Sequence, residues 1–89
     1  MKVIKRDGST VEFNKSKIRD AITKSMKNGS GILLPDIARL IANDAEKYFA
    51  KEEDVATIYK IEKYVYDRLV HYGQAETARA YEGYRAVQE

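Results

Sequence analysis

Apolar side chains recur every three or four residues in four stretches of the chain, which is the spacing of an amphipathic helix. Start and stop signals bound these stretches: Asn14 can cap the first, Pro35 suits the opening turn of the second, and Gly73 ends the third. The glycine-rich segment 28–31 ends the first helix, and a fourth helix is predicted over 74–87. The predicted apolar faces are Ile18, Ala21, Ile22, Ser25 and Met26; Ile37, Leu40, Ile41, Ala45, Tyr48 and Phe49; Ile58, Ile61, Val65, Leu69 and Tyr72; and Ala75, Ala78, Tyr81 and Arg85.

The start of the chain shows a different pattern, with short alternating segments on either side of Asp7-Gly8. This dipeptide favours the positive φ angles of a tight turn, so we predict a β-hairpin over residues 2–13. A two-residue turn and a bulged three-residue turn would pair different residues, and the sequence leaves both open. Val55-Ala56 can add a third, very short strand. Because an isolated hairpin is marginal in water, this one must lie against the helices.

Length and composition fit one α+β domain over residues 1–89, a small four-helix bundle capped by a β-hairpin or a three-stranded sheet. The chain has no cysteine, which excludes disulfides, thiolate zinc sites and cysteine nucleophiles. Its single histidine, His71, is expected at a helix surface, and the acids at 52–54 are expected to be solvated rather than to hold a metal. No apolar run is long enough to span a membrane, so we expect a cytoplasmic protein with no membrane partner. A chain of 89 residues has a thin core with little room for a large catalytic cavity, so we expect that the domain is not an enzyme by itself.

Charge is distributed unevenly along the chain. Residues 1–27 hold eight Lys or Arg and three acids, a balance of +5, whereas residues 28–89 hold eight and eleven, a balance of −3. A positive field on the N-terminal third would attract an anionic partner. A solvated lysine-rich surface would give the same balance, so charge alone leaves both interpretations open.

Three cations near the predicted hairpin suit the phosphates of a nucleotide. Binding a nucleoside triphosphate needs convergent cations, polar donors and an apolar slot for the base. If the hairpin lies against the start of the first helix, Lys5, Arg6 and Lys17 would surround one point near the positive end of the helix dipole.

Apolar residues on the same segments could form the slot for the base. Val3, Val11 and Ile18 could wall it, and Asn14 could either cap the helix or read the base edge. Neither GxxxxGK[ST] nor GxGxxG occurs in the chain, so a nucleotide site here has to be built without those glycine-rich loops.

Both ends of the chain also match a known pattern. Residues 3–18, VIKRDGSTVEFNKSKI, resemble the opening signature of ATP-cone domains, and residues 77–85, TARAYEGYR, resemble the closing helix of that family. The resemblance spans the whole chain and is strongest to the N-terminal cone of anaerobic (class III) ribonucleoside-triphosphate reductases. It implies a small helical bundle capped by a three-stranded sheet, which binds ATP or dATP and thereby controls the activity and oligomeric state of a ribonucleotide reductase.

The resemblance also implies roles for individual residues. Lys5, Arg6 and Lys17 would contact the phosphates, with Mg²⁺ arriving alongside the nucleotide, while no catalytic or protein-only metal site is expected. The implied partners are the catalytic domain or subunits of a larger reductase, assembled as a homo-oligomer. The adenine and ribose would be surrounded by Val3, Val11, Asn14 and Ile18, and closed from the other side by Val55 and by Tyr59, which stands where some members have histidine.

Other functions remain open at this point. ATP-cones also occur in a bacterial repressor of reductase genes, behind a zinc ribbon for which this chain has no cysteines. A basic nucleic-acid-binding domain would use the N-terminal third and bind with steep salt sensitivity, and a plain helical docking module would bind no ligand. A base-stacking role for the tyrosines is less favoured than packing in or beside the core, because four of them fall at helical spacing: Tyr48, Tyr72, Tyr81 and Tyr84.

Overall fold

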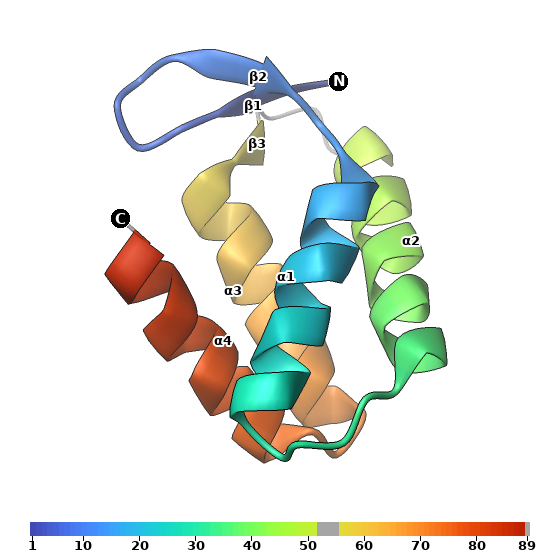
Figure 1. Ribbon diagram of the computed structural model, residues 1–89. Helices are drawn as coiled ribbons and strands as arrows, with labels where there is room; N and C mark the ends of the chain where they lie inside the picture. The colour runs from blue at the N-terminus through green and yellow to red at the C-terminus, as the bar shows by residue number, and fades with distance from the viewer. Residues whose placement is uncertain (52–55, 89) are drawn as a thin grey trace.

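A helical bundle with a small sheet across one end makes up the molecule (Figure 1). The computed structural model describes residues 1–51 and 56–88, with side chains described as far as Glu82. In this part of the chain, α1 packs against both α2 and α4, and α3 packs against α4 and α2. None of the described helices is long and apolar enough to cross a membrane. The elements are β1 (Lys2–Ile4), β2 (Thr10–Glu12), α1 (Lys15–Asn28), α2 (Pro35–Lys51), β3 (Ala56–Thr57), α3 (Ile58–His71) and α4 (Ala75–Gln88).

The sheet has the order β2-β1-β3, so its first strand is also its central one. β1 pairs with β2 in antiparallel register, with Val3 opposite Val11. On its other side β1 pairs in parallel with β3, with Val3 beside Ala56. The predicted α+β architecture is therefore confirmed, in its three-stranded form.

The hairpin turn adopts the bulged three-residue form of the two that the sequence left open. The Gly8 N–H donates to the Lys5 carbonyl at 3.0 Å, and the Lys5 N–H donates to the Ser9 carbonyl at 2.8 Å. Gly8 has a φ of 87°, a conformation that glycine adopts without strain. The Asp7 carboxylate accepts hydrogen bonds from the Ser9 hydroxyl at 2.6 Å and the Ser9 N–H at 2.9 Å, and these bonds lower its pKa. Arg6 is thereby held at the tip of the loop.

Local signals set the helix ends. The Asn14 side chain accepts the Ser16 N–H at 2.9 Å and caps α1, as predicted, and the Thr57 hydroxyl caps α3 in the same way. Gly73, with a φ of 76°, follows α3, and its N–H donates to the Val70 carbonyl at 3.0 Å.

The core lies where the four helices meet and reaches the inner face of the sheet. The buried face of α2 differs from the predicted one, because Ala38 is fully buried while Leu40 and Tyr48 are 42% and 46% exposed. Each of these bulky residues is one position, about 100° of helix rotation, from the buried line. On α4, Ala75 is likewise exposed, because it begins the helix. The core cluster comprises Val3, Ala21, Ile22, Met26, Ala38, Ile41, Phe49, Ala56, Ile61, Val65, Leu69, Ala78 and Tyr81.

Most of the tyrosines whose side chains are described pack in or beside the core, and Tyr59, which is 61% exposed, does not. Tyr81 is 2% exposed, and Tyr72 packs against the edge of the core cluster. The Tyr48 ring, although half exposed, lies 4.8 Å from the Tyr64 ring, centroid to centroid. The side chains of residues 84–85 lie outside the described part.

The end of α1 passes very close to the start of α4 at Gly29. A Cβ atom on Gly29 would lie 2.9 Å from the Glu76 carbonyl oxygen and 3.0 Å from the Thr77 Cα. Both neighbours are backbone atoms, which cannot rotate away as a flexible side chain would. Glycine at this position is therefore required for the observed α1–α4 contact.

Candidate functional site

A cavity of about 140 Å³, which we call the sheet cavity, lies between the hairpin and the first turns of α1 and α3. Five of the nine residues predicted to bind a nucleotide line it, and they come from the two hairpin strands and the start of α1. The complete described lining is Val3, Val11, Glu12, Phe13, Asn14, Lys17, Ile18, Ala21, Ile58, Ile61 and Tyr81.

Register and helical spacing bring the five predicted residues together. Val3 and Val11 are direct partners across the antiparallel pair, so their side chains share one face of the sheet. Asn14, Lys17 and Ile18 stand at positions i, i+3 and i+4 around the start of α1, which places them on one face of that helix. Val3 is 4% exposed and Val11 is 42% exposed, so the two valines form the inner and the outer part of the same wall.

The polar groups at the sheet cavity favour an anion over a cation. Lys17 supplies an exposed ammonium group, and both α1 and α3 begin beside the cavity with the positive ends of their dipoles. The Glu12 carboxylate is already bound by Lys2 Nζ at 2.7 Å and by the N-terminal ammonium at 3.3 Å. The hydrogen bond from Lys2, and then that from the N-terminus, lower the Glu12 pKa, so its charge is shared by two cations.

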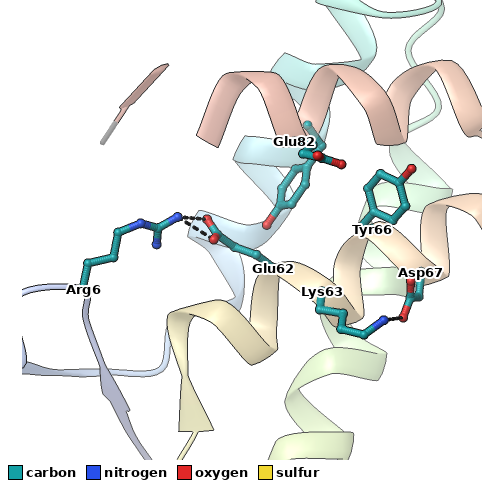
Figure 2. Close-up of a pocket in the computed structure, with 7 residues that line it drawn as sticks. Arg6, Glu62, Lys63, Tyr66, Asp67 and Glu82 are labelled. Atoms are coloured by element: carbon teal, nitrogen blue, oxygen red, sulfur yellow. Dashed lines mark hydrogen bonds and ion pairs between the residues drawn. The ribbon is translucent and has the colours of Figure 1, made fainter. Parts of the chain in front are cut away.

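A second cavity, of about 440 Å³, adjoins the first, and we call it the Arg6 cavity. Tyr81 lines both cavities, and the consecutive residues Ile61 and Glu62 of α3 line one each. Figure 2 shows the Arg6 side chain reaching from the hairpin across to Glu62. The complete described lining is Arg6, Glu62, Lys63, Tyr66, Asp67, Tyr81 and Glu82.

Ion pairs dominate the polar contacts of the Arg6 cavity. Arg6 Nη2 donates to both carboxylate oxygens of Glu62, at 2.6 and 2.9 Å, with the two side chains 25% and 15% exposed. The Arg6 guanidinium also lies over the Tyr59 ring, 4.9 Å from its centroid. On the same helix, Lys63 Nζ donates to Asp67 at 2.8 Å, and this contact raises the Lys63 pKa.

The remaining predicted residues lie in different places. Lys5 is exposed in the hairpin loop and is in the described lining of neither cavity. Tyr59 is 61% exposed and contacts Arg6 rather than lining the sheet cavity. Val55 lies outside the described residues. Lys17 and Arg6 thus line separate cavities that meet at Tyr81, and Lys5 is exposed on the hairpin loop.

Several residues at the two cavities were not predicted as part of a site. Three of them were expected as core residues: Ile58, Ile61 and Tyr81. Their apolar spacing predicts that they face the inside of the bundle, where the cavity lies. Phe13 continues the alternation of β2 toward the same face as Val11. For the four charged residues of the Arg6 cavity on α3 and α4, the sequence gives no comparable signal.

A family model described as the ATP cone domain matches residues 1–89, the full length of the chain. No curated protein matches it. The chain therefore belongs to the ATP cone family, whose members are regulatory rather than catalytic and bind ATP or dATP for allosteric regulation.

Proposed function

We propose that this ATP cone domain binds ATP or dATP with the base in the sheet cavity, and that binding regulates a ribonucleotide reductase. One observation carries the proposal: apolar side chains from the sheet, an ammonium group and two helix N-termini converge on one cavity. This is the combination that an adenine base attached to phosphates requires. The proposed binding residues are Val3, Lys5, Arg6, Val11, Asn14, Lys17, Ile18, Val55 and Tyr59.

The apolar part of the sheet cavity suits the base. Val3, Val11 and Ile18 present aliphatic surfaces, and Ile58 and Ile61 face them from α3. A flat aromatic base between two aliphatic walls buries apolar surface on both faces. Asn14 also lines this cavity, and we expect its amide to contact the base or ribose while it caps α1.

Cavity size supports a position for the phosphates outside the base slot. Pockets for drug-sized ligands typically hold ~300–1,000 Å³, whereas the sheet cavity holds about 140 Å³. A whole nucleotide therefore has to extend beyond it. Lys17 lies at the cavity, and the larger Arg6 cavity begins on the other side of Tyr81. We place the phosphates along this path, with Lys5 joining them from the hairpin loop.

We further propose that Mg²⁺ enters bound to the phosphates. Among the described residues there is no group of three or more His, Cys, Asp or Glu that could hold a metal ion. Mg²⁺ commonly keeps several waters and bridges nucleotide phosphates, so it needs few protein ligands.

Regulation would act through quaternary structure. A nucleotide shifts an equilibrium between two assemblies only by its difference in affinity for them, typically ~1–3 kcal/mol. We propose that the assemblies are homo-oligomers of a larger reductase, of the anaerobic class that the two ends of the chain resemble, located in the cytoplasm. The catalytic residues would belong to the rest of that protein.

A calorimetric titration of the domain with ATP, dATP, GTP and a short DNA duplex tests the proposal. We expect saturable binding of ATP and dATP, weaker binding of GTP, and no binding of the duplex at physiological salt. If no adenine nucleotide binds, the proposal fails. Tight duplex binding that weakens steeply with salt would instead support the nucleic-acid function.

A further inference from the structure

We propose that Glu62 sets the affinity of this domain for nucleotide phosphates by holding Arg6, so that a phosphate group has to replace the Glu62 carboxylate on the guanidinium. The inference rests on the proposed function, in which Arg6 contacts phosphate. Glu62 is opposite in charge to the residues expected to bind phosphate.

The contact between Arg6 and Glu62 joins two distant parts of the chain. The residues are 56 positions apart, and their side chains meet where the hairpin loop approaches α3 (Figure 2). One guanidinium nitrogen donates to both carboxylate oxygens, at 2.6 and 2.9 Å. Both side chains are largely buried, at 25% and 15% exposure, so water screens the pair less than it screens a surface ion pair.

The surroundings hold Arg6 in this position from several sides. Tyr59 and Glu62 stand at i and i+3 on α3, so they share one face of that helix. The Tyr59 ring lies against the Arg6 guanidinium, while Glu62 binds its Nη2. The three-residue turn, with Gly8 at positive φ, fixes the backbone from which the Arg6 side chain leaves.

A phosphate and a carboxylate compete for the same geometry on arginine. The guanidinium N–H groups donate to the oxygens of either group, here from Nη2 to Glu62, and such charge-assisted bonds are among the strongest in proteins. Glu62 therefore occupies a position that an incoming phosphate would take, and its negative charge also opposes that phosphate. A triphosphate carries more charge to offset this exchange than a monophosphate does. We thus expect Glu62 to make binding depend strongly on the number of phosphates, and to leave the base slot unaffected.

The test compares Glu62→Gln with a matched variant, Glu82→Gln, by calorimetric titration with ATP, AMP and adenosine. Glu82 lines the same cavity and is exposed, so its substitution removes the same charge while leaving the Arg6–Glu62 contact in place. We expect Glu62→Gln to tighten ATP binding by about fivefold to tenfold. Adenosine binding should be unchanged, and AMP binding should tighten more than ATP binding, because the monophosphate carries less charge to offset the exchange with Glu62. Glu82→Gln should bind ATP within about twofold of the unmodified domain.

Other results would overturn the inference. If the unmodified domain binds ATP and Glu62→Gln binds it equally or more weakly, Glu62 only positions Arg6 or supports the hairpin. If the unmodified domain binds no adenine nucleotide, the proposed function fails and this inference fails with it.

A measurement on the unmodified domain covers the case in which Glu62→Gln does not fold. NMR signals of the Arg6 guanidinium and the Glu62 carboxyl carbon should shift on addition of ATP and stay in place on addition of adenosine. Unchanged signals at saturating ATP would refute the exchange.

Discussion

Replacing Lys17 by alanine tests the proposed phosphate contact most directly. Lys17 lies in the first turn of α1 at the sheet cavity, and its side chain is exposed. Alanine is the best helix former, and substitutions of exposed residues usually change the free energy of unfolding by less than about 0.5 kcal/mol. The variant should therefore fold normally, which a thermal melt followed by circular dichroism can check.

The expected loss of affinity follows from the bond that Lys17 would make. A hydrogen bond between an ammonium and a phosphate contributes about 1–3 kcal/mol, which corresponds to a roughly 5-fold to 150-fold rise in Kd. Calorimetric titration with ATP measures this change. Adenosine, which has no phosphate, should bind the variant and the unmodified domain equally.

Lys15→Ala provides the control for Lys17→Ala. Lys15 lies two residues earlier on the same helix, but it faces another surface, where its Nζ lies 3.6 Å from Glu46. Its removal takes away the same charge from the same region, so a general loss of positive field would weaken ATP binding in both variants. If Lys17→Ala binds ATP within about twofold of the unmodified domain, the phosphates do not lie where we place them.

Three further predictions concern the elements that build the site. Gly29→Ala should lower the free energy of unfolding by about 1–3 kcal/mol in a denaturant titration, because its Cβ would meet backbone atoms of α4; an unchanged midpoint would contradict the close contact. Asn14→Ala should destabilise the domain by about 1 kcal/mol through loss of the α1 cap, and stability equal to that of the unmodified domain would show that the cap contributes nothing. Ser9→Ala removes a donor to the Asp7 carboxylate, so an NMR titration should show the Asp7 pKa, which lies below 3.8 in the unmodified domain, moving up toward that value. Because the Asp7 pKa is lowered in the folded state, the stabilisation from Asp7 is present above pH 3.8 and is lost as the pH falls through the folded pKa. A Ser9→Ala variant with the same Asp7 pKa would show that the Ser9 hydroxyl does not lower it.

The elements of the fold could be predicted because their signals are local. Helical spacing, the Asn14 cap, Asp7-Gly8 and Gly73 each act within a few residues of where they stand, and the structure confirms each one. The choice between two hairpin turns, and the exact buried line of α2, could not be predicted. The outward position of Leu40 depends on how α2 is rotated against its neighbours. A rotation of the helix by about 100°, the angle between successive residues, would bury other side chains and expose some that are now in the core.

The candidate site also has a part that local signals in the sequence predict and a part that depends on how distant elements pack. The residues of the sheet cavity lie in one short N-terminal segment, so strand register and helical spacing suffice to bring them together. The contact of Arg6 with Glu62 depends instead on the tilt of the hairpin toward α3, which nothing near Arg6 in the sequence specifies. The role of Tyr81 could not be predicted either. Its apolar spacing indicates burial and gives no sign that Tyr81 lines both cavities.

The central position of β1 has a consequence for how the domain assembles during synthesis. Its second neighbour, β3, lies more than fifty residues later in the chain, so the parallel pairing of Val3 with Ala56 must wait until α1 and α2 have emerged. Closing so long a loop is slow compared with forming a hairpin or a helix. The wall of the sheet cavity contributed by Val3 and the start of α3 is thus completed late, and a nascent or truncated chain ending before β3 would have the signature residues of its N-terminus without a finished cavity.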